Sequence, residues 1–113
     1  MFHSTYVFTG ETICRRPAQS YTEFTDELNR LQTLQQTFAQ SSIIERTALL
    51  QQFADSLTQN QERLAEMVCE EVGRCLHECR AEISKSIELI RYYVRLAPEL
   101  LAHKTIATQA SLS

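Results

Sequence analysis

Apolar residues recur at three- and four-residue spacing through most of the chain, which predicts amphipathic helices rather than strands. Residues 20–23 read Ser-Tyr-Thr-Glu, a capping box in which Ser20 and Glu23 satisfy free backbone N–H groups at a helix start. The apolar stripe that follows comprises Phe24, Leu28, Leu31, Leu34 (or Gln35) and Phe38. We therefore predict a first helix with one apolar face and a solvated polar face.

The capping signature repeats at residues 42–45, Ser-Ile-Ile-Glu, which predicts a second helix. Its apolar face comprises Leu49, Leu50, Phe53, Ala54 and Leu57. The pattern then breaks, and Asn60 is a residue type that caps a following helix. The third helix carries Leu64, Met67, Val68 and Val72. It should end at Gly73, which suits a left-handed C-terminal cap.

The last predicted helix is the longest, and its apolar stripe continues for about seven turns. The stripe runs through Leu76, Cys79, Ile83, Ile87, Ile90, Val94, Ala97 and Leu101. Pro98 should bend this helix or mark its last turns, because proline lacks an N–H donor and clashes with the preceding turn. We expect so long a stripe to need a partner surface.

The amino terminus predicts a small β-hairpin, in which two β-prone runs within residues 5–16 flank Thr9-Gly10-Glu11. Gly10 can supply the positive φ of a tight turn. An isolated hairpin is marginal in water, so this one should lean on another element. We therefore predict a mainly α fold with three parts: a hairpin arm at 1–19, four helices at 20–104, and a truncated strand or tail at 105–113.

Composition narrows the classes of protein to consider. The chain has 113 residues, 43% of them apolar, with only two glycines and two prolines, which suits one small helical domain. The charged residues are interspersed and give a net charge of −3, so nucleic-acid binding has no electrostatic basis. No apolar run approaches the ~20 residues that span a bilayer. Without a secretory signal and with four cysteines in no disulfide pattern, we expect a cytoplasmic protein and no membrane partner.

Candidate metal ligands gather at Cys69, Cys75, His77 and Cys79. Structural zinc sites pair closely spaced cysteines with a second ligand pair further on, and this chain has no second pair. His77 falls on a different helix face from Cys75 and Cys79, so it is no base for a catalytic thiol. We predict small structural cysteines and no metal, with a cysteine-based metal or redox module as an alternative.

Other candidate groups also favour structural roles. Glu70-Glu71 and the pair Glu78 and Glu82 could serve acid–base work, but nearby cations should neutralise them. Those cations are Arg74, Arg80 and Lys85. Gly10 and Gly73 are isolated, so no phosphate-binding loop exists. Of Tyr92 and Tyr93, we expect one packed and one exposed. The residues therefore predict no catalytic, cofactor-binding or metal site.

A set of short motifs resembles the aldehyde dehydrogenase family along nearly the whole chain. In that family a Glu-Arg pair begins the second helix, and Glu-x-Gly-Lys-Pro-Leu separates the third helix from the long fourth one. The turn Thr9-Gly10-Glu11 and residues 106–113 also match, the latter most similar to the succinate-semialdehyde dehydrogenase branch. The matching helical residues are Glu45-Arg46, Ala48-Leu49-Leu50, Leu57, Leu64-Ala65, Glu71-Val72-Gly73-Arg74, Glu82, Ser86-Ile87, Ile90-Arg91-Tyr92-Tyr93 and Leu101-Ala102.

The resemblance implies an enzyme that oxidises an aldehyde, such as succinate semialdehyde, to the acid with NAD or NADP. In the family a cysteine thiolate attacks the aldehyde, hydride passes to the nicotinamide, and a glutamate-activated water releases the acid. Those parts follow the region matched here, and none of the four cysteines aligns with the nucleophile. The resemblance thus implies an amino-terminal segment, inactive alone, that packs beside a cofactor-binding sheet. Its leading hairpin would belong to the oligomerisation region.

Three positions depart from the family pattern. Val7-Phe8 replaces Asn-Pro before the hairpin turn, Cys75 replaces the proline before the long helix, and Arg74 replaces lysine. The expected partner is the remainder of an aldehyde dehydrogenase, or another copy of the chain through the long helix. The alternative from another class is a stand-alone helical protein that uses this stripe for interaction or dimerisation.

Overall fold

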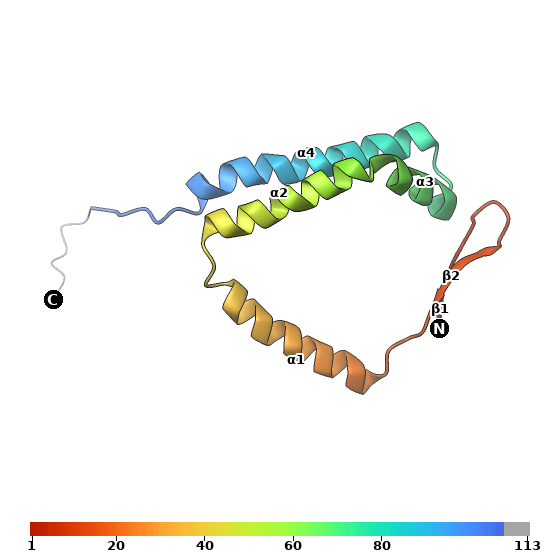
Figure 1. The fold of residues 1–113 in the computed structure, drawn as a ribbon, viewed down its shortest axis with the longest axis horizontal. Helices are drawn as coiled ribbons and strands as arrows, with labels where there is room; N and C mark the ends of the chain where they lie inside the picture. The colour runs from red at the N-terminus through yellow and green to blue at the C-terminus, as the bar shows by residue number, and fades with distance from the viewer. Residues whose placement is uncertain (108–113) are drawn as a thin grey trace.

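The computed structural model describes residues 1–107, in which an amino-terminal hairpin precedes four helices (Figure 1). The strands are β1 (Phe2–Thr5) and β2 (Thr12–Arg16). The helices are α1 (Tyr21–Phe38), α2 (Ile43–Gln59), α3 (Gln61–Val72) and α4 (Leu76–Leu100). The predicted fold class is therefore confirmed. Residues 108–113 of the expected strand or tail lie outside the described residues, and residues 105–107 form neither helix nor strand.

Both predicted capping boxes are present. The Glu23 backbone N–H donates to Ser20 Oγ at 3.2 Å, and the Ser20 backbone N–H donates to the Glu23 carboxylate at 2.7 Å. Ser42 and Glu45 repeat this pair of bonds at the start of α2. These local bonds satisfy N–H groups that a helix start otherwise leaves free, so they fix where α1 and α2 begin.

The boundaries of α3 lie where the sequence predicted, but only one end is capped as expected. Gly73 has φ 77° and ends α3 as a left-handed cap, with its N–H donating to the Cys69 carbonyl at 2.8 Å. Asn60 stands at the N-cap position of α3 as predicted, but its side chain makes no capping bond, because its amide instead donates to the Ser56 carbonyl at 2.8 Å. With φ −105° and ψ 9°, Asn60 lacks the extended conformation of an N-cap and closes α2.

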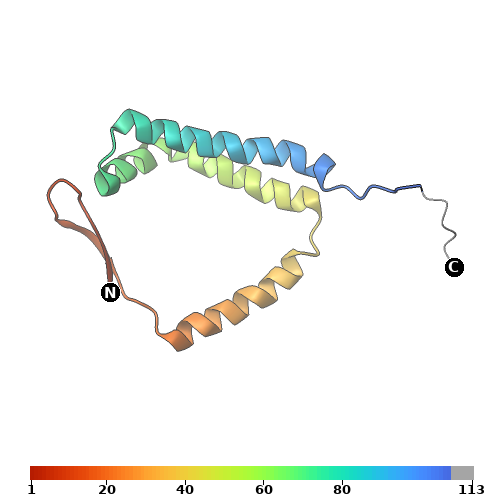
Figure 2. The same ribbon diagram turned by 180° about the vertical axis from the view of Figure 1, so that it is seen from behind.

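The core lies where α2 and α3 pack along α4, with α2 running antiparallel to it (Figures 1 and 2). Fully or nearly buried positions are few and mostly small: Thr47, Ala54, Ala65, Cys79 and Ile87. Small side chains let helix backbones approach closely, and Ile87 fills the middle of the α4 contact. The helix ends as expected, with Pro98 in its last turn.

The α4 stripe is covered within the chain, contrary to the expectation that it needs a partner. Cys79 and Ile87 are buried, and Ile83, Ile90 and Val94 are half-buried, because α2 and α3 present apolar faces to this side of α4. Polar links reinforce the contact: the Arg91 guanidinium donates to Asp55 at 3.2 Å, and Arg80 pairs with Glu62. These exposed ion pairs contribute little stability.

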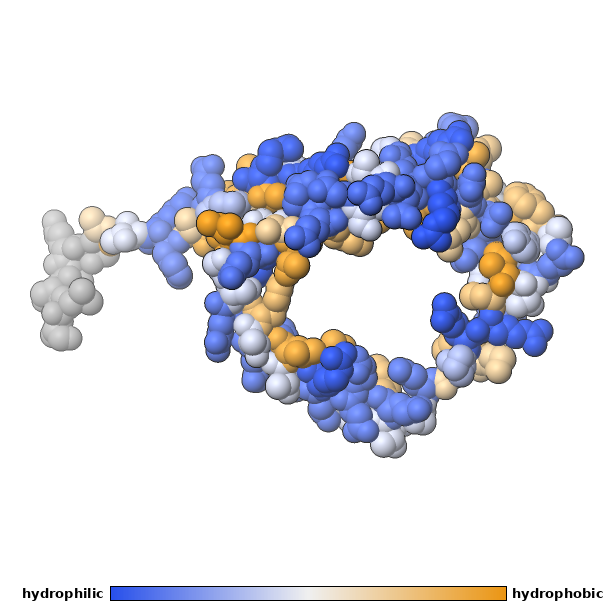
Figure 3. Space-filling view, viewed as in Figure 1, coloured by the Kyte–Doolittle hydropathy of each residue, from blue (hydrophilic) through white to orange (hydrophobic). Residues whose placement is uncertain are grey.

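The uncovered stripe belongs to α1, which has no buried residue and stands apart from the other helices (Figures 1 and 2). Its stripe residues, named the α1 stripe below, are 48–55% exposed: Phe24, Leu28, Leu31, Leu34 and Phe38. In Figure 3 hydrophobic side chains of α1 gather at the rim of the opening between α1 and the other helices. The radius of gyration is 20.8 Å, against about 13 Å for a compact domain of this length.

The hairpin has a longer loop than predicted. β1 pairs antiparallel with β2, Phe2 opposite Arg16 and Ser4 opposite Cys14, so the first strand ends at Thr5 and not beyond it. Residues 6–11 form the loop, within which the Val7 N–H donates to the Glu70 carbonyl of α3 at 3.0 Å. This bond explains the early end of β1 and confirms that the hairpin leans on another element.

Candidate functional site

The cysteine and histidine cluster is dispersed by the fold. Cys75 is exposed at the residue before α4, Cys69 is half-buried on α3, and Cys79 is buried on α4. His77 is exposed. Across residues 1–107, no group of three or more His, Cys, Asp or Glu side chains is arranged to hold a metal ion. The alternative of a metal module therefore gains no support from the geometry.

Cys79 is the most enclosed thiol and is poorly suited to act as a nucleophile. Burial raises its pKa, and the neighbouring Cys69 and Glu82 raise it further. Its Sγ lies 3.9 Å from the Arg74 carbonyl oxygen. Since the thiolate is the reactive form, a raised pKa leaves less of it at neutral pH. Cys79 acts here as a small core residue.

The paired carboxylates are partly neutralised as expected. Arg74 reaches over the start of α4 and pairs with Glu82 at 3.1 Å. Arg80 does not serve Glu78 or Glu82, as the sequence suggested, but pairs with Glu62 on α3. Its contact with Glu62 lowers the pKa of that carboxyl group. A carboxylate held ionised by an arginine is unsuited to general acid work near neutral pH.

The burial of the two adjacent tyrosines differs from the expectation that one is packed and the other exposed. Tyr92 and Tyr93 are 48% and 54% exposed, so neither is packed into the core. Their ring centroids lie 5.4 Å apart with an interplanar angle of 79°, an edge-to-face contact. An edge-to-face contact between two adjacent rings covers only part of each, so both remain about half exposed.

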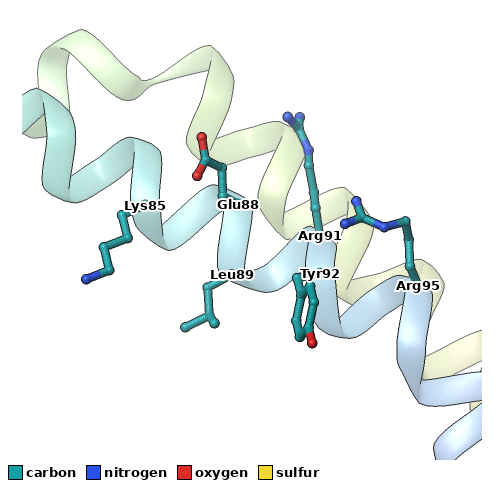
Figure 4. A pocket seen from close by; sticks show the side chains of 6 residues that line it. All are labelled: Lys85, Glu88, Leu89, Arg91, Tyr92 and Arg95. Carbon is teal, nitrogen blue, oxygen red and sulfur yellow. The ribbon is translucent and has the colours of Figure 1, made fainter.

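An open depression on the outer side of α4 escaped the sequence reasoning (Figure 4). Lys85, Leu89 and Tyr92 point to one side of the helix, whereas Arg91 points toward α2. Their spacing of four and three residues was the signal that could have found it. The depression is lined by Lys85, Glu88, Leu89, Arg91, Tyr92 and Arg95. A single helix face encloses no substrate, so this depression lacks the shape of a catalytic pocket.

The described residues also offer no dinucleotide site. Gly10 lies in the hairpin loop and Gly73 ends a helix, so neither opens a helix after a strand as a phosphate-binding loop requires. No helix among residues 1–107 is both long and apolar enough to cross a lipid bilayer. The distinctive features of the described residues are therefore their helix starts, their helix ends and their uncovered apolar faces.

These features agree with comparison to known proteins. The sequence pattern of the aldehyde dehydrogenase family matches residues 2–112. The chain belongs to the aldehyde dehydrogenase family. Its curated relatives include a succinate-semialdehyde dehydrogenase (NADP(+)) of Deinococcus radiodurans, 26% identical over 88% of this chain and 21% of the relative. A probable succinate-semialdehyde dehydrogenase (NADP(+)) of Synechocystis sp. is 30% identical over 93% of this chain and 23% of the relative.

Two solved dehydrogenase structures show the same fold over this segment. A succinic semialdehyde dehydrogenase from Streptococcus pyogenes, in complex with NADP+, superposes with a TM-score of 0.85 at 23% identity, over 96% of this chain and 24% of that one. A glyceraldehyde-3-phosphate dehydrogenase from Methanocaldococcus jannaschii, complexed with NADP, gives 0.78 at 21% identity, over 86% and 21%. The chain thus spans about a fifth to a quarter of the length of these relatives.

The structure explains several residues of this aldehyde dehydrogenase chain that match the family pattern. Glu45 of the Glu-Arg pair completes the α2 capping box, and the hydrogen bond from the Ser42 backbone lowers the pKa of its carboxyl group. Arg46 is partly buried, and its Nε has no hydrogen-bond partner among the described residues. A buried donor without an acceptor is costly, so the Nε of Arg46 is an unfavourable feature of this arrangement.

The Glu-x-Gly motif and the departure at Cys75 are likewise explained by backbone geometry. Gly73 needs its left-handed φ and also lies against Val7 of the hairpin loop. Cys75 adopts φ −60°, the value that proline imposes, even though the family's proline is absent. The backbone at this joint is therefore the one that a proline would favour.

Proposed function

We propose that this chain serves as the amino-terminal helical segment of a semialdehyde dehydrogenase that uses NADP, with succinate semialdehyde as the leading candidate substrate. In this proposal it comprises a hairpin arm at 1–19 and a helical segment at 20–104. The chain's part is structural: it presents α1, α4 and the hairpin for packing against other parts of the enzyme. We further propose that the 113 residues alone do not oxidise aldehydes.

One observation carries this proposal. The family pattern covers nearly all of the chain, while the chain covers only 21–23% of the relatives' length. The substrate and cofactor class are proposed by analogy with those relatives, which are succinate-semialdehyde dehydrogenases (NADP(+)). The inactivity of the chain alone is supported by the dispersed cysteines, the ionised Glu62 and the absence of a phosphate-binding loop among the described residues. A dehydrogenase needs both a positioned cofactor and an activated nucleophile.

An absorbance assay tests the inactivity directly. Purified chain is mixed with succinate semialdehyde and NADP+, and in parallel with NAD+, and NADPH or NADH formation is followed. The purified Synechocystis relative serves as the positive control. We expect no reduced nucleotide above the rate without protein. Sustained, aldehyde-dependent formation by the chain would contradict the proposal.

A second candidate function is a stand-alone helical dimerisation module. The observation that favours it is the uncovered α1 stripe, although the sequence assigned this role to the last helix. Light scattering coupled to size-exclusion chromatography separates the two functions. A stable dimer of the purified chain, with no dehydrogenase activity in any context, supports the module; a monomer removes it.

A further inference from the structure

We propose that, in the 113-residue chain on its own, α1 folds back over the link at residues 39–42 and packs against α2 as an antiparallel helix. The α1 stripe is about half exposed at every position. Beside the face packed on α4, α2 carries a second face, named the α2 free face, on which Leu50 and Phe53 are exposed and Arg46 and Leu57 are half-buried. This inference goes beyond the proposed function, because it says where α1 lies when nothing else covers it.

The spacing of the two faces matches. Along α2 the free face advances by four, three and four residues, and α1 shows the same steps in reverse through Gln35, Leu31, Leu28 and Phe24. Counted in residues along the chain, each α1 residue precedes the Gln40–Ser41 peptide bond by as many positions as its α2 counterpart follows it. An antiparallel pair about that bond places Leu31 beside Leu50, and Leu28 beside Phe53. Apolar area then leaves water along both helices.

The buried donor on α2 supports the same register. Arg46 Nε is shielded from solvent and lacks an acceptor among the described residues. Its counterpart in the antiparallel pair is Gln35, the one polar position in that α1 set, whose side-chain oxygen can accept a hydrogen bond. The spacing match and the unsatisfied Arg46 Nε are therefore consistent with the same register.

The link favours closure within one chain over exchange with a second copy. Its four residues fall in the range used by antiparallel helix pairs. The N–H groups of Gln40 and Ser41 bond to the carbonyls of Thr37 and Phe38, one turn back, so residues 39–41 can rearrange while Ser42 keeps its capping bonds to Glu45 of α2. So short a tether gives α1 a high effective concentration at α2, which a second molecule in dilute solution does not match.

The arrangement in which α1 stands apart from α2, named the open form, is the one that this segment shares with a much longer dehydrogenase. It superposes on the Streptococcus pyogenes enzyme over 96% of its length but on only 24% of that chain. In isolation nothing else covers the α1 stripe, and the hydrophobic effect favours the closed pair.

Small-angle X-ray scattering with light scattering on the purified chain tests closure. We expect a monomer whose radius of gyration is nearer to the roughly 13 Å of a compact domain than to the 20.8 Å of the open form. A monomer near 20.8 Å would overturn the proposal, and so would a dimer at all concentrations measured. Neither result bears on dehydrogenase activity, so failure here leaves the proposed function separately testable.

Matched variants identify the contact. Leu31→Asp places a charge in the α1 stripe, and Phe53→Asp places one on the α2 free face; both residues are exposed in the open form, so the α2–α4 core is untouched. We expect either variant to shift the radius of gyration back toward the open value. Asn29→Asp adds the same charge on the far side of α1 and should leave it unchanged. Equal scattering from all three variants would contradict the inference.

Discussion

Gly73, at the end of α3, lies directly beneath Val7 of the hairpin loop: a Cβ added at Gly73 would come within 2.9 Å of Val7 Cγ1. Together with the hydrogen bond from the Val7 N–H to the Glu70 carbonyl, this contact joins the hairpin to the helices. A family motif at the end of a helix thus has two physical reasons for glycine, a left-handed φ and a close neighbour.

We expect Gly73→Ala to lower the free energy of unfolding by about 1–2 kcal/mol, because alanine is strained at φ 77°, and to loosen the hairpin as well. Gly10→Ala is the matched control: its φ is 73°, but no atom lies within 4 Å of an added Cβ. Gly10→Ala carries the φ strain alone, whereas Gly73→Ala adds a clash with Val7, so urea denaturation followed by circular dichroism should show the larger drop in midpoint for Gly73→Ala. Equal effects would mean that the Val7 contact is unimportant.

Restoring the family's proline at Cys75 should stabilise the chain. Cys75 already has φ −60°, and its carbonyl accepts from Glu78 and Cys79, bonds that a proline retains. Its own N–H makes no backbone hydrogen bond among the described residues. We expect Cys75→Pro to raise the free energy of unfolding by about 0.4–1 kcal/mol. Cys75→Ala, which keeps the flexible φ, is the control; a proline variant less stable than this alanine variant would refute the explanation.

Stability of the helix starts should depend on pH in the acid range. Bonds from the Ser20 and Ser42 backbones lower the pKa of Glu23 and Glu45 in the folded chain. A carboxyl group whose pKa is lowered by folding contributes its full stabilisation of the folded chain above its ordinary pKa of about 4.3. That stabilisation is lost as the pH falls through the lowered pKa. We expect helix content to fall over that window.

The double variant Glu23→Gln/Glu45→Gln should flatten this loss, since glutamine can complete a capping box without titrating. Glu71→Gln removes a charge from α3 that makes no side-chain hydrogen bond among the described residues, and should keep the full pH dependence. Circular dichroism during acid titration of the three proteins gives the comparison. Parallel curves for all three would exclude the capping carboxylates as the cause.

Thiol labelling should rank the cysteines by burial. Cys14 and Cys75 are exposed, whereas Cys79 is buried with a raised pKa. We expect iodoacetamide to modify Cys79 roughly tenfold or more slowly than Cys14 and Cys75 under native conditions. In urea the rates should converge. Rapid native labelling of Cys79, read by mass spectrometry of its peptide, would show that the α3–α4 contact is open.

The sequence predicted the local features of this fold better than its long-range contacts. The capping boxes at Ser20 and Ser42 and the left-handed cap at Gly73 depend on neighbouring residues, so spacing alone reveals them. The extent of β1 was not predictable in this way, because the Val7 N–H bonds to Glu70, far along the chain. A strand pattern says nothing about such an acceptor.

The sequence also could not predict which helix would be left with an uncovered apolar face. An apolar stripe indicates that a helix face is buried somewhere, but it does not name the partner. Small residues at Ala54 and Ala65 let α2 and α3 cover the α4 stripe, which left α1 exposed instead. That the chain holds no catalytic constellation stays a prediction from the residues. The unsatisfied Arg46 Nε could not be predicted, because only atomic packing reveals it.

A transplant measures the central claim most directly. Residues of the Synechocystis relative that align with this chain are replaced by the chain itself, and NADPH formation from succinate semialdehyde is measured beside the parent enzyme. We expect a soluble hybrid with the parent's oligomeric state and measurable NADP-dependent activity. A hybrid that folds and assembles but forms no NADPH, or one that cannot fold at all, would contradict the role of these helices as the structural start of such an enzyme.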